Sequence, residues 1–315
     1  MEVLCAGHVN WDVTLSVDRL PEPDGEVTLR GSQQAGGGSA ANVAVNLAGL
    51  GVSASVFGSI GTDEPGSNAR RELAASGVET HLVRADGDTA VKYLVVDGDG
   101  EVMVLSGAGE NEAYTPHDLP PDALDVDVLH LTNQPPSVAA GLARRAREAN
   151  VTVSLAPGRR IAERDFSTAL GLADLVFVND REAAALGPDP WCDRLRDDAT
   201  LVVTLGSEGA QVRTRADTHR HRGYEVKPLD TTGAGDAFAA GFLAARGGGL
   251  ADSPLAEVVA RLDATDEERR RDARGDDPTP ALAVANACGA VASRALGARA
   301  DLDPEALRAV IADEN

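Results

Sequence analysis

The sequence is poor in lysine and cysteine, and each shortage excludes a class of protein. Its 315 residues include 50 Asp or Glu against 29 Lys or Arg, a formal net charge of −21, and only Lys92 and Lys227 are lysines. A surface this acidic repels nucleic acid and anionic lipid, so neither is an expected partner. The cysteines, Cys5, Cys192 and Cys288, are far apart and form no CxxC pair. That spacing argues against a disulfide framework and a cysteine-based zinc site.

Long apolar runs and aromatic residues are also scarce. No stretch of 18 or more apolar residues occurs, so we expect no membrane-spanning helix. The N-terminal segment MEVLCAGHVN has no basic region followed by an apolar one, so we expect no secretory signal and a cytoplasmic location. The dispersed acidic residues and the 3% aromatic content favour adaptation to a high-salt cytoplasm. Molar salt shortens the Debye length to about 3 Å, which would screen the self-repulsion.

Short β-branched runs alternate with helical patterns along most of the chain. The runs predict buried strands at Val3–Ala6, Ala54–Phe57, Val128–Leu131, Val151–Leu155, Leu175–Val178 and Leu201–Leu205. Helices are predicted at about 39–50, 65–76, 137–149, 180–186, 233–246 and 281–296. This rhythm predicts an α/β fold with a doubly wound, mostly parallel sheet flanked by helices. Functional sites are then expected at the carboxyl ends of the strands.

Two segments interrupt this rhythm within what we expect to be one domain over residues 1–315. Turn-separated strands at Val13–Val17, Val27–Arg30, Ala90–Val96 and Glu101–Leu105 predict a small antiparallel sheet, from about 13–35 and 88–108. The segment at about 247–280 opens with three glycines, carries a charged run and closes with Asp-Asp-Pro-Thr-Pro. It predicts a surface insertion, with decoration or an effect on nucleotide access or oligomer contacts as open alternatives.

The segment DTTGAGDAF, Asp230–Phe238, opens a predicted helix after a strand-like stretch at Tyr224–Val226. Its glycines let the backbone turn tightly, and the N–H groups at the helix start can cradle a phosphate. Asp236 lies in that first turn, where it can accept a proton from a hydroxyl. The simpler alternative is that Asp236 only stabilises the helix terminus. A dinucleotide fingerprint fails at Phe238, and a Walker P-loop is excluded because neither lysine follows a GxxxxG loop.

A second glycine-rich segment, Gly36–Gly51, precedes an Ala-rich helical pattern and can bring backbone close to a small polar ligand. The two segments resemble the N- and C-terminal signatures of the ribokinase-like (PfkB) family of carbohydrate and nucleoside kinases. The C-terminal match is complete over the nine residues Asp230–Phe238. The resemblance implies a ribokinase-like fold in which the small sheet is a β-lid that closes over the sugar and excludes water.

The resemblance also implies roles for residues in the order the family requires. Asp236 would be the general base, with an anion hole formed by Gly233, Ala234 and Gly235. The sugar hydroxyls would be bound by Asn10, Asp12, Gly37, Gly38 and Asn42. The nucleotide side would be formed by Asn179, Glu182, Thr204, Gly206 and Asn286. Glu182 would organise Mg²⁺ through water, and Asp230, with the loop at about 293–299, is the candidate site for a monovalent cation such as K⁺.

By the same resemblance, the activity is phosphoryl transfer from ATP to an alcohol group, with ATP and Mg²⁺ required and K⁺ a candidate activator. The favoured acceptor is ribose or a nucleoside, because the lid has no arginine cluster that suggests a phosphorylated sugar. Ser39 replaces a lysine of ribokinase, and Gln134 lies near the place where ribokinase uses a glutamate on the sugar. Ala156 stands where many relatives have Asp or Asn before a proline. Alternatives are another sugar, a sugar acid or a sugar phosphate, such as 2-keto-3-deoxygluconate or fructose phosphate. A catalytically silent sugar- or nucleotide-binding sensor also stays open. A homodimer through the lid is expected.

Overall fold

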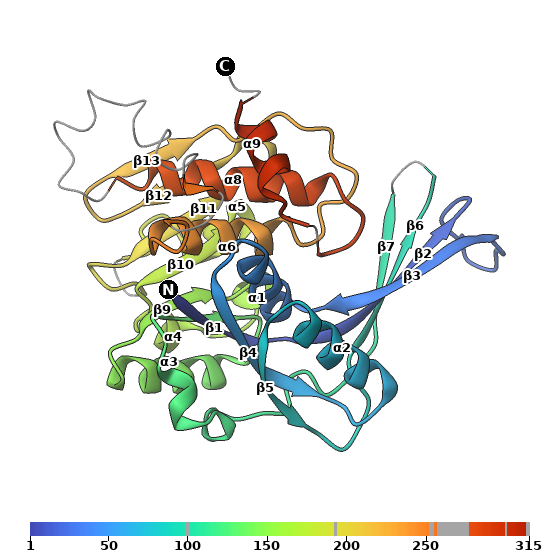
Figure 1. Ribbon diagram of the computed structural model, residues 1–315, viewed down its shortest axis with the longest axis horizontal. Helices are drawn as coiled ribbons and strands as arrows, with labels where there is room; N and C mark the ends of the chain where they lie inside the picture. The colour runs from blue at the N-terminus through green and yellow to red at the C-terminus, as the bar shows by residue number, and fades with distance from the viewer. Residues whose placement is uncertain (99–100, 192–193, 252–254, 257–276, 300, 313–315) are drawn as a thin grey trace.

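A large sheet covered by helices on both faces forms the body of the molecule, and a smaller sheet projects from one side (Figure 1). The computed structural model describes residues 1–98, 101–191, 194–251, 255–256, 277–299 and 301–312. The predicted architecture, a mostly parallel sheet flanked by helices with a small second sheet, is confirmed.

The large sheet has the strand order β13-β12-β11-β10-β9-β8-β1-β4-β5. Its strands are β1 (Glu2–Gly7), β4 (Ser53–Ile60), β5 (Glu79–Arg84), β8 (Val128–Thr132), β9 (Thr152–Ala156), β10 (Leu175–Asn179), β11 (Thr200–Thr204), β12 (Ala210–Arg213) and β13 (Thr218–His221). All neighbouring strands from β5 to β11 in this order pair in parallel. The pairs β11–β12 and β12–β13 are antiparallel. The six strands expected in the body are all present. The sequence analysis missed β5, β12 and β13, because these half-exposed strands carry no continuous apolar run.

Helices cover the two faces of this sheet with two separate cores. One face packs against α1 (Ser39–Gly49), α2 (Glu64–Ala75), α6 (Ala234–Arg246), α8 (Thr279–Ser293) and α9 (Pro304–Ala312). The other packs against α3 (Pro136–Glu148), α4 (Ser167–Leu170) and α5 (Asp180–Leu186). Successive side chains of a strand point to opposite faces. Accordingly, Val3 and Cys5 of β1 lie in the first core, while Leu4 and Ala6 lie in the second.

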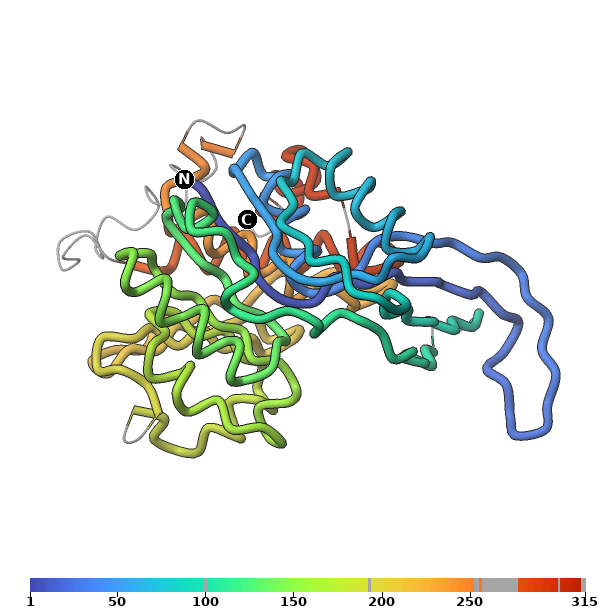
Figure 2. Tube along the Cα trace, turned by 90° about the horizontal axis from the view of Figure 1, so that it is seen from below, coloured from blue at the N-terminus to red at the C-terminus, as the bar shows by residue number. Residues whose placement is uncertain are grey.

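The small sheet, called the lid sheet below, has the order β3-β2-β6-β7 and extends away from the body (Figure 2). Its strands are β2 (Asn10–Val17), β3 (Leu29–Gly37), β6 (Val91–Val96) and β7 (Val102–Ser106). The two outer pairs are antiparallel, but the central pair of β2 and β6 is parallel. This pair differs because β6 reaches β2 after the chain has passed through β4, α2 and β5, whereas a short hairpin turn would have reversed its direction.

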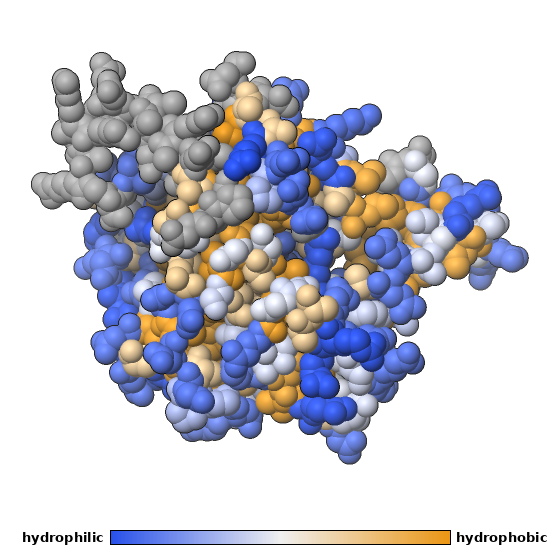
Figure 3. Space-filling view, in the orientation of Figure 1, coloured by the Kyte–Doolittle hydropathy of each residue, from blue (hydrophilic) through white to orange (hydrophobic). Residues whose placement is uncertain are grey.

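Several large apolar side chains are exposed on the lid sheet, among them Leu29, Tyr93, Val104 and Leu105, at 41–55% of their full accessible area. Figure 3 shows apolar surface at the base of the projecting sheet, and further apolar patches among hydrophilic ones on the body. Exposed apolar patches often mark contact surfaces. The lid-mediated homodimer stays a prediction.

Two further expectations concern the C-terminal third. Tyr224–Val226 is not a strand but irregular chain, and the expectation of a strand there was wrong. The side chains of Tyr224 and Val226 pack against the first core, and this packing accounts for the strand-like apolar pattern. Most of the expected surface insertion, 252–254 and 257–276, lies outside the described residues, while Leu250 and Leu255 at its start are buried. Among the described helices, none has the length and apolar content needed to cross a membrane.

The charge of −21 leads to a prediction about salt. Raising the salt from about 0.1 M to about 1 M shortens the Debye length from about 10 Å to about 3 Å, so repulsion across the folded surface weakens. The repulsion is smaller in the expanded unfolded chain, and we therefore expect Tm and the activity implied by the sequence resemblance to rise over this range in KCl. A parallel series in NaCl at equal ionic strength separates screening from a specific K⁺ effect. A Tm that is flat or falls with salt would contradict the interpretation of salt adaptation.

Candidate active site

The carboxyl ends of five parallel strands meet at one edge of the large sheet. Gly7 of β1, Thr132 of β8 and Ala156 of β9 lie level with one another, as do Asn179 of β10 and Thr204 of β11. Side chains that follow these strands therefore lie along the same edge, where open α/β sheets bind their ligands.

Asp236 lies in the first turn of α6 and contacts α1 across the site. The Asn42 side-chain amide of α1 donates a hydrogen bond of 2.8 Å to Asp236 Oδ2. Gly233 precedes the helix with φ +77°, in the left-handed region that favours glycine. A Cβ at Gly233 would collide with the carbonyl group of Ala298. The turn that places Asp236 thus depends on glycine twice, for its backbone angle and for its close packing.

The electrostatic surroundings of Asp236 suit a proton acceptor. The residue is partly exposed, so a ligand can reach it, yet the protein around its carboxylate raises its pKa to about 6. Removal from water is the main cause, and the negative charge of Asp12 acts in the same direction. The hydrogen bond from Asn42 and the positive charges of Lys92 and Arg299 oppose it. The carboxylate is therefore mostly deprotonated at pH 7, with a basicity close to the working pH, as a general base requires.

The residues expected on the acceptor side cluster where β2 meets β3 and α1. Asn10 pairs with Gly37 in the β2–β3 ladder, and a Cβ at Gly37 would collide with the carboxylate of Asp12. Gly38 has φ +93°, and a Cβ there would collide with the backbone of His8 and Asn10. Asn10 Nδ2 and Asp12 Oδ1 are buried with no hydrogen-bond partner among the described residues. Because buried polar atoms are normally paired, these unpaired atoms suit a polar ligand. Burial also raises the pKa of Asp12.

Three charged residues of this site were missed by the sequence analysis. Arg299 donates from Nε to Asn42 Oδ1 at 3.2 Å and from a terminal nitrogen to Glu72 Oε1 at 2.8 Å. Glu72 accepts the backbone N–H of Gly36 at 2.9 Å. Lys92 lies opposite Asp12 in the β2–β6 register. Its position follows from that parallel pairing, which the sequence did not reveal. The loop containing Arg299 was considered only as a cation site.

Of the residues expected on the nucleotide side, Asn179 and Glu182 form a capping box at the start of α5. Asn179 Oδ1 accepts the Glu182 N–H at 2.9 Å, and Glu182 Oε2 accepts the Asn179 N–H at 3.1 Å. The motif thus has a structural function at the helix terminus. Among the described residues no group of three or more His, Cys, Asp or Glu could hold a metal ion. One partly buried carboxylate fits Mg²⁺, which often keeps several waters and takes few protein ligands.

Thr204 and Gly206, at the end of β11, lie on the turn that joins β11 to β12. This turn closes with a hydrogen bond from Leu205 N–H to Gly209 O, and Gly209 packs against the chain at His221–Gly223. Asn286 of α8 contacts the same stretch, with its Nδ2 3.1 Å from His221 Nδ1. The expected nucleotide-side residues Thr204, Gly206 and Asn286 therefore border one region, and His221 joins them.

The carboxylate of Asp230 accepts two backbone N–H groups. Oδ1 accepts from Thr232 at 2.8 Å and Oδ2 from Gly297 at 2.9 Å. This buried side chain therefore ties the chain before α6 to the loop after α8. Its role in binding a monovalent cation stays a prediction.

The comparison with known proteins identifies the family. The profile of the pfkB family of carbohydrate kinases matches residues 1–305. The chain belongs to this family. It is 47% identical to the ATP-dependent ribose-1-phosphate kinase of Halopiger xanaduensis over 318 residues, covering 99% of both chains. It is 31% identical to the fructokinase of Klebsiella pneumoniae, covering 90% of this chain and 92% of that one.

A solved structure supports the assignment of the fold. The nucleoside kinase of Methanocaldococcus jannaschii matches 99% of this kinase with a TM-score of 0.77, at 22% identity and over 98% of its own chain. The expected ribokinase-like family, fold and enzyme class are confirmed. This pfkB kinase is an ATP-dependent phosphotransferase that acts on a hydroxyl group of a sugar or nucleoside.

Proposed function

We propose that this kinase transfers the γ-phosphoryl group of ATP to a hydroxyl of ribose 1-phosphate, with Asp236 as the general base. The observation that carries the catalytic part is the contact between Asn42 and Asp236 at the start of α6. It places a carboxylate with a pKa of about 6 beside the residues of the acceptor side. The acceptor is supported by the 47% identity, over nearly the full length, to a ribose-1-phosphate kinase. This proposal replaces ribose or a nucleoside as the favoured acceptor.

The chemistry follows from these positions. Asp12, Asn10 and Asn42 bind hydroxyl groups of the acceptor and direct the reacting hydroxyl toward Asp236. The Asp236 carboxylate accepts the proton of that hydroxyl while its oxygen attacks the γ-phosphorus and the bond to ADP breaks. The N–H groups of residues 233–235 stabilise the negative charge on the transferring phosphoryl group. Of these, the N–H of Ala234 donates to Thr231 O at 3.2 Å in this structure and would have to turn to the phosphoryl oxygens. Glu182 would hold Mg²⁺ through water, and the ion, when bound, neutralises charge on the phosphate oxygens.

A panel of acceptors tests this proposal. ADP release would be measured with ribose 1-phosphate, ribose, adenosine, fructose, fructose 6-phosphate and 2-keto-3-deoxygluconate. We expect the highest kcat/KM with ribose 1-phosphate. A higher value with any other member would overturn the proposed acceptor, and no ADP release with any of them would favour a silent sensor.

Asp12 supplies a more local test of the acceptor side. Asp12→Asn should raise KM for the acceptor about 10- to 100-fold, because a charge-assisted hydrogen bond contributes roughly 1.5–3 kcal/mol. The loss of its negative charge should also lower the pKa of Asp236, which would move the acidic limb of the pH profile to lower pH. Asp122→Asn, at an exposed position in the short 3-10 helix Pro121–Leu124 before β8, is the matched control. An unchanged acceptor KM in Asp12→Asn would exclude the assigned role.

A further inference from the structure

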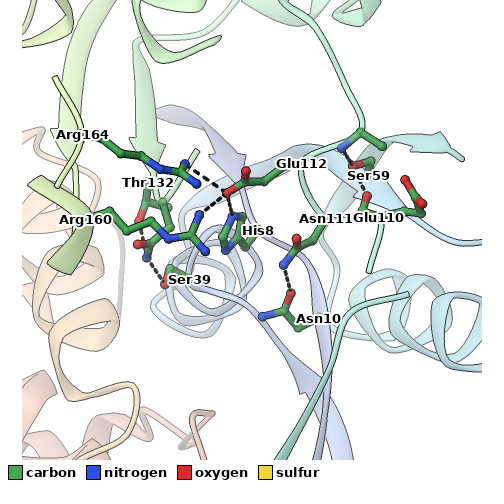
Figure 4. A network of polar contacts seen from close by, with 12 residues as sticks. His8, Asn10, Ser39, Ser59, Glu110, Asn111, Glu112, Thr132, Arg160 and Arg164 are labelled. Carbon is green, nitrogen blue, oxygen red and sulfur yellow. Dashed lines mark hydrogen bonds and ion pairs between the residues drawn. The ribbon is translucent and has the colours of Figure 1, made fainter. Parts of the chain in front are cut away.

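Three nitrogen donors converge on a single carboxylate oxygen beside the acceptor residues. Glu112 Oε1 lies 3.0 Å from His8 Nε2, 2.5 Å from a terminal nitrogen of Arg160 and 3.5 Å from one of Arg164. Figure 4 shows these side chains pointing toward Glu112 from different parts of the chain. His8 follows β1, and Arg160 and Arg164 follow β9. Glu112 lies in the irregular segment after lid strand β7.

This cluster borders the acceptor side directly. Asn111, next to Glu112, donates a hydrogen bond of 2.7 Å to Asn10 Oδ1 (Figure 4). A Cβ at Gly38 would collide with the carbonyl group of His8. Gln134, at the end of the adjacent β8, is buried, and neither of its amide atoms has a hydrogen-bond partner among the described residues. A ligand that occupies the acceptor side therefore has the cluster as a neighbour.

The balance of charge in the cluster is positive, in a chain whose total charge is −21. Two arginines face one carboxylate, and the positive charges of Arg160 and of Lys92 also act on His8. The hydrogen bond with His8, aided by the positive charges of Arg164 and Arg160, lowers the pKa of Glu112 to about 2, so it is charged at pH 7. The side chains of Arg160, Arg164 and Glu112 are 43%, 34% and 27% exposed, so an anion from solvent can reach them. Guanidinium groups bind phosphate with two parallel hydrogen bonds, which suits this cluster to a phosphate ligand.

We propose that Arg160 and Arg164 form the subsite for the phosphate group of the acceptor, and that Glu112 occupies this subsite when the acceptor is absent. The inference rests on the proposed acceptor, ribose 1-phosphate. The sequence analysis favoured an unphosphorylated acceptor because the lid has no arginine cluster. Arg160 and Arg164 lie instead in the body of the molecule. Since Glu112 follows β7, displacement of its carboxylate by the phosphate links acceptor binding to the lid sheet.

Binding without ATP tests the subsite independently of turnover. Titration calorimetry would compare ribose 1-phosphate with ribose for the wild type, Arg160→Gln and Arg164→Gln. We expect the wild type to bind the phosphorylated sugar more tightly, and each variant to lose about 10- to 100-fold of that preference while its affinity for ribose is unchanged. Arg144→Gln, on the exposed side of α3, removes the same charge and should keep the preference. Equal preference in the wild type and in both variants would overturn the subsite.

Glu112→Gln distinguishes a displaceable anion from a structural clamp. With its charge removed, the competition for the arginines weakens, so we expect tighter binding of ribose 1-phosphate. If Glu112 only holds the arginines in place, Glu112→Gln should lower the Tm and leave the affinity for ribose 1-phosphate weaker or unchanged. That result would contradict the displacement. Tight, arginine-dependent binding without ADP release would leave the subsite standing and overturn the proposed reaction. A wild type that prefers ribose to ribose 1-phosphate would overturn both.

Discussion

Replacement of Asp236 by asparagine is expected to lower kcat by about 10²–10⁴-fold, the usual contribution of a general base. The amide keeps the size of the side chain and an oxygen that can accept from Asn42, but it cannot take up the proton of the attacking hydroxyl. ATP affinity should change little, because the backbone N–H groups at the start of α6 remain. Initial rates and nucleotide binding by calorimetry would measure the two effects separately.

The pH dependence gives this prediction a second readout. Because the pKa of Asp236 is about 6, kcat/KM of the wild type should fall as the pH decreases through about 6, where the base becomes protonated. The same raised pKa means that the charged carboxylate destabilises the fold. Its effect on stability is absent below the usual aspartate value of 3.8 and grows as the pH rises toward 6. Asp236→Asn should therefore have a higher Tm than the wild type at pH 7, and the difference should vanish near pH 3.

The alternative for Asp236, a charge that only stabilises the helix terminus, predicts the opposite result. Glu64→Gln is the control, since Glu64 is the acidic residue in the first turn of α2. It should lower stability slightly, by about 0.3–1 kcal/mol, and leave kcat unchanged. If Asp236→Asn behaved in the same way, with near-normal turnover and a lower Tm, the assignment of the base would be wrong.

Gly233→Ala should cost nearly as much activity as the loss of the base. An alanine there must adopt φ +77°, which costs roughly 1–2 kcal/mol, and its Cβ collides with the carbonyl group of Ala298. Either the first turn of α6 or the loop at 294–299 has to move. A displacement of about 1 Å at a reacting group can cost on the order of 10²-fold in rate. We expect a loss in kcat of that size, measured under saturating ATP and acceptor.

Gly77→Ala separates the collision from the backbone strain. Gly77 has the same φ of +77°, but a Cβ there meets no atom within 4 Å. This control should lose stability from strain alone and keep its kcat. Equal kcat values for Gly233→Ala and the wild type would show that close packing against Ala298 does not position the catalytic turn.

The sequence predicts best what depends on neighbouring residues. The buried strands of the body were found because each is a short run rich in apolar and β-branched residues. The segment at Asp230–Phe238 was found because its residues are adjacent in the chain. The structure brings Asp236 of that segment to Asn42 of the other motif, which local patterns do not show. Lys92, Arg160 and Arg299 were missed because their positions depend on strand register and on contacts between distant segments. The parallel pairing of β2 with β6 was missed for the same reason, because it joins distant segments.

The contacts around Asn42 have a consequence for how the enzyme is made. Asn42 forms hydrogen bonds with Asp236, 194 residues further along the chain, and with Arg299, 257 residues further along. The site therefore joins the first and last parts of the chain. A ribosome-bound chain can form most of the sheet long before Arg299 is synthesised, yet it has no complete acceptor side. Contacts between distant segments also form late in folding, because closing long loops is entropically costly. Recovery of phosphoryl transfer during refolding should therefore lag behind recovery of helical signal and report the final assembly step.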